Sequence, residues 1–113
     1  MYVTTGDNYS DPVTATSDAV IAFRLDNGRM LWHRQFTAGD AMNLSCWQPG
    51  RTNCPDSDGP DFDFGAPAML VTLGGNRRAL ILGQKSGMMW AVDPDRRGRL
   101  LWEFRASVGG VAG

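Results

Sequence analysis

The stretch AFRLDNGRMLW, from Ala22 to Trp32, decides the fold, because a second copy of its hairpin lies near the end of the chain. Gly28 to Trp32 (GRMLW) returns as Gly98 to Trp102 (GRLLW). The apolar runs on either side are too short for helices, and Asn27-Gly28 supplies the positive-φ residues that a tight hairpin requires. The copies are further apart than in an ordinary four-stranded repeat, which indicates an insertion between them. A repeated hairpin predicts an all-β propeller or a related array.

The bulk composition excludes two kinds of partner. The 113 residues are 42% hydrophobic, and 11 basic and 12 acidic residues leave a net charge of −1. We therefore expect a globular chain that binds neither nucleic acid nor an anionic membrane surface. No apolar run approaches the roughly 20 residues of a membrane span. The first residues, MYVTT, lack the basic start and apolar centre of a signal peptide, so they do not indicate a location.

The order of apolar and turn residues predicts about one and a half propeller blades. Residues 1–36 are expected to end one blade, and residues 37–67 to form an inserted loop. Residues 68–106 are expected to make one full blade from four short strands, at 68–73, 78–84, 88–93 and 100–106. An array normally needs about three repeats to bury its faces. We therefore expect a piece of a longer propeller that does not fold stably alone.

The two cysteines lie in the polar inserted loop. Cys46 and Cys54 have no histidine or further cysteine near them in the sequence. Such a close pair suits a disulfide better than a zinc site. A disulfide in turn favours an oxidising compartment.

Five motifs follow one another along the chain: TGDN (5–8), the first Trp hairpin, DFDFG (61–65), GQKSG (83–87) and the second Trp hairpin. Their order and spacing resemble the quinoprotein alcohol dehydrogenases, and the cysteine-bearing insertion resembles the polyvinyl-alcohol dehydrogenase-like subgroup. The resemblance implies an eight-bladed β-propeller that uses pyrroloquinoline quinone (PQQ) and calcium.

The same resemblance implies that the indoles of Trp32 and Trp102 are docking elements between neighbouring blades. Both copies depart from the family pattern Ala-x-Asp-x-x-Thr-Gly-x-x-x-Trp. The first carries Arg24 and Asn27 at the Asp and Thr positions, and the second has one extra residue before Gly98.

The resemblance implies that Asp63 is the catalytic base. Oxidation of an alcohol by hydride transfer requires a group that removes the hydroxyl proton, and a carboxylate in a water-poor site with a raised pKa suits this role. Phe62 and Phe64 would anchor its backbone. Without the resemblance, Asp63 would be a turn or cap residue, and a rival alignment without an insertion places Asn43 at this position.

Lys85 matches the family's basic residue beside the quinone oxygens, where an ammonium group would stabilise negative charge. It is the only lysine in the chain, and its alternative is a solvated turn residue. The family's calcium ligand falls on Asp7 by position and on Asn8 by residue type, and oxygen donors of either kind suit calcium. An Asx-turn is the alternative for this loop.

These assignments predict oxidation of a primary or secondary alcohol substrate, with electrons passing to a cytochrome c, either separate or fused elsewhere in the full chain. The remaining propeller blades would complete the site, in a periplasmic or secreted protein. The competing hypothesis is a non-catalytic propeller that acts as a protein-binding scaffold in the cell envelope. A scaffold would have no reason to place Asn8, Asp63 and Lys85 at the matching positions. The sequence indicates neither the substrate nor the oligomeric state.

Overall fold

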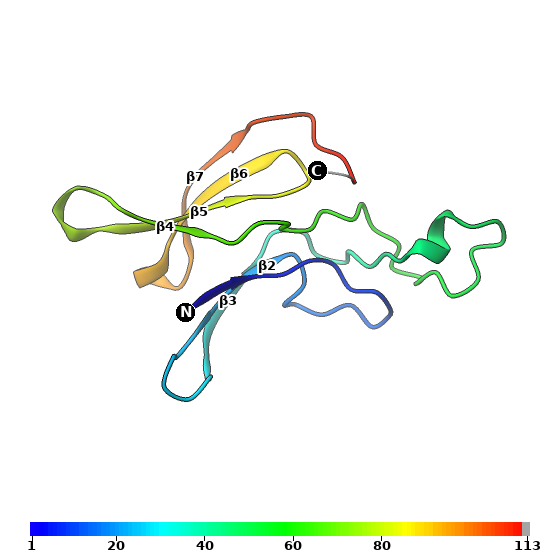
Figure 1. The fold of residues 1–113 in the computed structure, drawn as a ribbon, viewed down its shortest axis with the longest axis horizontal. Helices are drawn as coiled ribbons and strands as arrows, with labels where there is room; N and C mark the ends of the chain where they lie inside the picture. The colour runs from blue at the N-terminus through cyan, green and yellow to red at the C-terminus, as the bar shows by residue number, and fades with distance from the viewer. Residues whose placement is uncertain (112–113) are drawn as a thin grey trace.

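The fold is all-β, as the computed structural model of the chain shows for residues 1–111 (Figure 1). Two antiparallel sheets follow one another along the chain. The first has the order β1 (Tyr2–Thr4), β2 (Ala19–Phe23), β3 (Met30–Gln35). The second has the order β4 (Met69–Thr72), β5 (Arg78–Gly83), β6 (Met88–Asp93), β7 (Arg99–Arg105). Both are meanders of neighbouring strands, which confirms the predicted all-β propeller fragment.

Helical structure in residues 1–111 is limited to three short 3₁₀ turns, η1 (Leu44–Trp47), η2 (Gly74–Asn76) and η3 (Pro94–Arg96). Helices long and apolar enough to cross a membrane are absent from this part of the chain.

The repeated sequence forms a repeated structure. Ala22 pairs with Trp32 in the first hairpin, Ala91 pairs with Trp102 in the second, and the register shifts directly after each Ala. The first turn closes with the N–H of Gly28 donating to the carbonyl of Arg24 at 3.0 Å. In the second turn the corresponding bond runs from Gly98 to Asp93 at 2.9 Å. The extra residue is absorbed by η3 and by Arg97, whose φ is 53°.

Side chains from both sheets and from the connection between them form one core. Its buried members are Val20, Ala22, Trp32, Phe64, Leu80, Leu82, Trp90 and Val92. Partly buried Phe36 extends it, with its ring 4.5 Å from Trp90 and 5.3 Å from Phe64 between centroids. Phe64 therefore fixes the end of the DFDFG motif in the core, although no strand runs through that motif.

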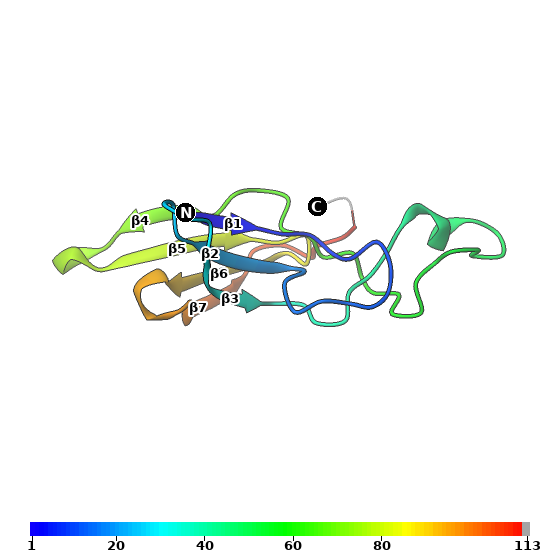
Figure 2. The ribbon, with the colours of Figure 1, turned by 90° about the horizontal axis from the view of Figure 1, so that it is seen from below.

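The connection between β3 and β4 projects away from the sheets. In Figures 1 and 2 the green segment that carries η1 lies at the far end of the elongated molecule. Ala41 links it to the loop after β1 through an isolated bridge to Asn8, and a second bridge, from Ala41 to Asp58, joins two parts of the connection itself.

Trp32 contacts the second copy of its own hairpin. A Cβ atom added to Gly98 would lie 2.7 Å from Cζ3 of the Trp32 ring, and Arg34 Nη1 donates to the Gly98 carbonyl at 3.3 Å. Trp32 is 7% exposed, whereas its counterpart Trp102 is 46% exposed. The first indole is thus buried against the neighbouring turn, and the second is open to a further contact.

This contact makes Gly98→Ala destabilising. The substitution is expected to cost about 1–2 kcal/mol of backbone strain at φ 72° and about 1–3 kcal/mol of overpacking against Trp32. Gly28→Ala is a matched control, because its φ is 71° and no atom lies within 4 Å of the added Cβ. Denaturant titration of both variants in the full-length protein measures the difference. Equal losses of unfolding free energy would show that the ring tolerates the added methyl group.

Candidate functional site

Three loops bring four charged side chains together at one end of the sheets. Asp7 follows β1, Asp61 and Asp63 precede β4, and Lys85 lies in the turn between β5 and β6. Lys85 Nζ lies 2.6 Å from Asp63 Oδ2 and 3.1 Å from Asp61 Oδ1. The two residues predicted as base and quinone-side cation are therefore in direct contact.

Backbone contacts fix Asp63 beside the TGDN loop. The N–H of Asp7 donates to Asp63 Oδ1 at 2.7 Å, and the N–H of Lys85 donates to the Asp63 carbonyl at 3.0 Å. Gly6 leaves the space for this carboxylate, since a Cβ there would lie 2.2 Å from Asp63 Oδ1. Position 6 therefore requires glycine because the Asp63 carboxylate lies so close to its backbone, and not because of a positive φ.

Burial and neighbouring charges give the carboxyl groups different pKa values. Burial raises the pKa of Asp7 to about 6, and the nearby Asp63 and Asp61 add to the effect. Burial also raises the pKa of Asp61 in spite of Lys85. Asp63 is subject to the same burial, but the hydrogen bonds from Lys85 and from the Asp7 N–H outweigh it and lower its pKa. Asp63 is therefore ionised and able to accept a proton, in contrast to the raised pKa that we expected of the base.

Lys85 stays protonated within the site. Its burial alone would lower the pKa of the ammonium group, but the hydrogen bonds to Asp63 and Asp61 raise it. The solvated-turn alternative does not describe this lysine, whose side chain is 22% exposed.

The structure places the two candidate metal ligands differently. Asp7 offers a carboxylate oxygen that lies within 4.8 Å of oxygens from Asp61 and Asp63, and we call these three residues the acidic cluster. The Asn8 side chain instead accepts from the N–H of Thr14 at 2.8 Å and so closes its own loop across six residues. Hard oxygen donors at this spacing suit a calcium ion.

One further aspartate, Asp40, supports the cluster, and sequence reasoning did not single it out. Asp40 is fully buried, and its two oxygens accept from the N–H groups of Asp61 at 3.0 Å and Phe62 at 2.9 Å. A Cβ at Gly59 would lie 2.3 Å from Asp40 Oδ1. Asp40 thus orients the backbone that carries Asp61, and Asp61 itself lies in the same DFDFG motif as the predicted base.

Asp18 is a buried carboxyl group whose oxygens have no hydrogen-bond partner within residues 1–111. Burial, with the nearby Asp40 and Asp63 adding to it, raises the pKa of Asp18 to about 7. The folded chain therefore holds this proton more tightly than the unfolded chain, whose carboxyl pKa is near 3.8. The contribution of Asp18 to the free energy of unfolding consequently falls as the pH rises from about 4 to about 7.

Asp18→Asn is expected to remove this part of the pH dependence. Compared with the natural protein, the variant should have a higher melting temperature at pH 8 and an unchanged one at pH 4. A rise of the Asp18 pKa from 3.8 to about 7 corresponds to a gain of up to about 4 kcal/mol in the free energy of unfolding at pH 8. Melting curves of the full-length protein across this pH range check the difference. Asp56→Asn, at an exposed position, is the control, and parallel pH profiles for Asp18→Asn and the natural protein would contradict the assignment.

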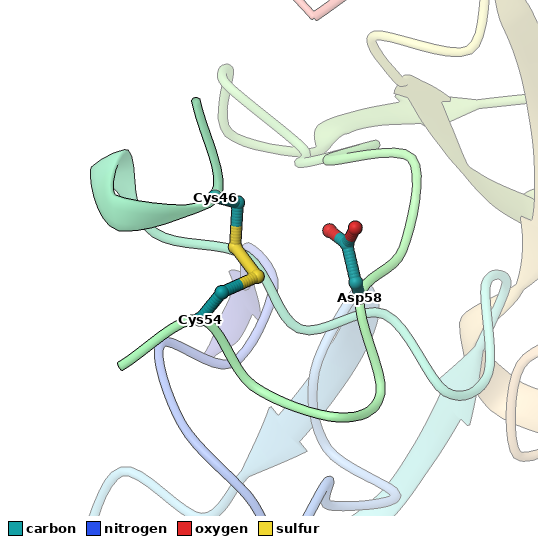
Figure 3. Close-up of side chains that lie close together, drawn as sticks. All are labelled: Cys46, Cys54 and Asp58. Carbon is teal, nitrogen blue, oxygen red and sulfur yellow. A yellow bond between two sulfur atoms is a disulfide. The ribbon is translucent and has the colours of Figure 1, made fainter. Parts of the chain in front are cut away.

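The cysteines of the projecting segment form the predicted disulfide. Cys46 and Cys54 are bonded across a separation of eight residues, as Figure 3 shows. Asp58 lies close to the pair in the same view, and Arg51 forms an ion pair with it. Because both sulfurs are in the disulfide, they are not available as metal ligands.

An open cavity of about 590 Å³ lies between the charged groups and the segment that contains the disulfide. Its lining residues are Tyr9, Met42, Asn43, Leu44, Ser45, Trp47, Asp61, Asp63 and Lys85. The lining therefore combines three charged side chains with apolar and uncharged polar ones.

Asn43, the rival candidate for the base position, has a scaffolding geometry. Its Nδ2 donates to the carbonyls of Tyr9 at 2.9 Å and Asn53 at 3.0 Å. Its Oδ1 accepts from the N–H of Ser45 at 2.8 Å and so caps η1. This position needs both a donor and an acceptor, which an amide supplies.

Known proteins similar to this chain are dehydrogenases, which are oxidoreductases. Over its whole length the chain is 38% identical to the polyvinylalcohol dehydrogenase of Sphingopyxis sp. (strain 113P3) and 39% identical to that of a Pseudomonas species. It spans 18% and 17% of the lengths of these two relatives. Neither a family model nor a solved structure matches the chain. The resemblance to polyvinyl-alcohol dehydrogenase-like proteins is thereby confirmed.

Proposed function

We propose that this chain forms the base-bearing part of the active site in a PQQ- and calcium-dependent alcohol dehydrogenase. The observation that carries the proposal is the contact of Lys85 with Asp63 and Asp61 at one open cavity, with an oxygen of Asp7 close to both carboxylates. Charged groups gathered in this way at a cavity are typical of active sites. The similarity to two polyvinylalcohol dehydrogenases supports an alcohol as the substrate.

The residues of the site fit the two groups that the proposal requires. Within the acidic cluster, Asp7 would hold calcium through carboxylate oxygens, since these are the ligands that the ion prefers, and Asp63 would stay free as the base. PQQ, when bound, supplies the quinone carbon that accepts the hydride. Lys85 would place its positive charge beside the quinone oxygens and so stabilise the charge that develops there.

The chain's own contribution to the chemistry is removal of the hydroxyl proton. An ionised Asp63 would accept this proton at a carboxylate oxygen, and Lys85 and the Asp7 N–H hold that carboxylate in place. Asp61 accepts a hydrogen bond from the same Lys85 ammonium group, so one positive charge is shared between the Asp61 and Asp63 carboxylates.

The rest of the proposal follows the family. Residues 1–36 would end one blade, residues 37–67 would be an insertion, and residues 68–106 would be a complete blade. The remaining blades would close the site, and a cytochrome c would receive the electrons. The disulfide supports a periplasmic or secreted location.

Dye reduction by a full-length dehydrogenase that carries this chain tests the proposal. The Sphingopyxis relative, with its matching segment replaced by this chain, provides such a protein. We expect activity on propan-2-ol and polyvinyl alcohol only when both PQQ and calcium are added. Turnover without PQQ would contradict the quinoprotein assignment, and absence of both activity and PQQ binding would favour the scaffold hypothesis.

A further inference from the structure

A guanidinium group lies directly against one sulfur of the disulfide. Arg51 Nη2 donates to Cys54 Sγ at 3.1 Å, and the same nitrogen forms the ion pair with Asp58. Figure 3 shows the Asp58 carboxylate beside the sulfur–sulfur bond, and one of its oxygens lies within 4.8 Å of both sulfurs. The cation thus contacts Cys54, whereas the carboxylate is close to both members of the pair.

This contact gives the two sulfurs unequal chemistry in thiol–disulfide exchange. In that reaction a thiolate attacks one sulfur, and the other sulfur leaves as a thiolate anion. A cation beside the leaving sulfur stabilises the anion and speeds its departure. The negative charge of Asp58 opposes this effect, and the direct hydrogen bond from Arg51 decides which sulfur is favoured. Attack is therefore directed to Cys46, with Cys54 as the leaving group.

The disulfide lies where a thiol reagent can reach it. Both cysteines are partly exposed, and the segment that carries them projects away from the sheets (Figures 1 and 2). Further blades would pack against the faces of the two sheets, whereas this segment extends beyond the ends of the strands.

The disulfide also closes a loop that has few other attachments. In the part of the chain that the structure describes, the hydrogen bonds of residues 44–54 reach only residues 43–58. Leu44 and Trp47 of this loop line the same cavity as Lys85. Opening of the disulfide therefore releases part of the lining of that cavity.

We propose that Cys46 and Cys54 form a thiol–disulfide exchange site whose opening loosens the lining of the cavity. A dithiol is the reductant. Its first thiolate bonds to Cys46 Sγ, the bond between the two cysteines breaks, and Cys54 leaves as a thiolate beside Arg51. The second thiolate of the reagent then attacks the reagent sulfur of this mixed disulfide, and Cys46 leaves. The dithiol is oxidised to a disulfide, the cystine gains two electrons, and the two protons of the reagent balance the two cysteine sulfurs. This inference goes beyond the proposed function and needs neither PQQ nor calcium.

Reduction of the full-length protein by dithiothreitol measures the effect of Arg51. Samples are acidified at intervals, alkylated and digested, and mass spectrometry then quantifies the peptides with free Cys46 and Cys54. We expect Arg51→Gln to slow reduction on the order of tenfold, because the departing thiolate loses its charge-assisted hydrogen bond. Arg51→Lys keeps the charge and should recover much of the rate. Arg29→Gln, at an exposed arginine of the β2–β3 turn, should leave the rate unchanged.

Asp58→Asn separates the effect of charge from that of loop structure. The amide can still accept a hydrogen bond from Arg51, but the negative charge beside the sulfurs is gone. Reduction of this variant should therefore be faster than that of the natural protein. If the ion pair acted only by stiffening the loop, Arg51→Gln and Asp58→Asn would both react faster, and that result would overturn the proposal.

Two further measurements test the direction of attack and the release of the loop. With the monothiol glutathione, the first adduct should form on Cys46, and an adduct formed mainly on Cys54 would refute the assigned leaving group. Trypsin cleaves after Arg51, so the reduced and alkylated protein should be cut there faster than the oxidised protein. Equal rates of cleavage would show that the lining of the cavity is not loosened.

Discussion

Asp63→Asn will lower kcat of the full-length dehydrogenase by about 10²–10⁴-fold, the range that general base catalysis contributes. The amide keeps the shape of the side chain and can still accept a hydrogen bond from Lys85 or from the Asp7 N–H. It cannot take the proton of the alcohol. We therefore expect PQQ to remain bound while turnover stops, which absorbance titration and dye reduction measure on the same sample.

Two matched variants locate the effect. Asp56→Asn changes an exposed carboxylate of the same connecting segment and should leave kcat unchanged. Asp61→Asn removes the other partner of Lys85. If Asp63→Asn turns over normally and Asp61→Asn does not, the base is Asp61, and normal turnover by both would remove the carboxylate pair from the proposal.

Lys85→Ala has the second largest expected effect. Removal of the ammonium group leaves Asp61 and Asp63 facing each other without their counter-ion. The cation also no longer stabilises charge on the quinone oxygens, and loss of one such group costs about 10²–10³-fold in rate. We expect slower cofactor reduction in stopped-flow experiments, or weaker PQQ binding.

The pH profile gives Lys85→Ala a second readout. Lys85 lowers the pKa of Asp63, so without it the carboxylate becomes protonated at higher pH. The acid limb of kcat/KM should therefore move to higher pH in Lys85→Ala and return in Lys85→Arg, which restores the charge. Wild-type kinetics with an unmoved acid limb would contradict a role of Lys85 in the chemistry and leave it as the structural counter-ion of Asp61 and Asp63.

The local order of apolar and turn residues predicted the positions of the strands to within one or two residues at each end. The expected strands at 78–84 and 88–93 correspond to β5 (Arg78–Gly83) and β6 (Met88–Asp93), because short apolar runs bounded by Gly, Asn and Ser are local signals. The disulfide was predicted for a similar reason. It needed only two cysteines close in sequence and no competing ligand.

The long-range hydrogen bonds that hold the site residues in place could not be predicted from local sequence patterns. The hydrogen bonds that the Asp40 carboxylate accepts from the N–H groups of Asp61 and Phe62 span about twenty residues of irregular chain. No periodicity sets such a register. The burial of Asp18 depends equally on long-range packing, and its sequence position before β2 resembles that of an ordinary turn aspartate. Asp61 was missed although it lies in a recognised motif, because the resemblance directed attention to one carboxylate of that motif.

The contact between Trp32 and Gly98 also bears on how the two hairpins can diverge. Each copy of a duplicated segment is usually free to change once the other keeps the original role. Here the ring of one copy fills the space left by the missing side chain of the other. A larger residue at position 98 therefore requires a smaller one at position 32, in addition to tolerating the φ of 72°, so changes at the two positions are coupled.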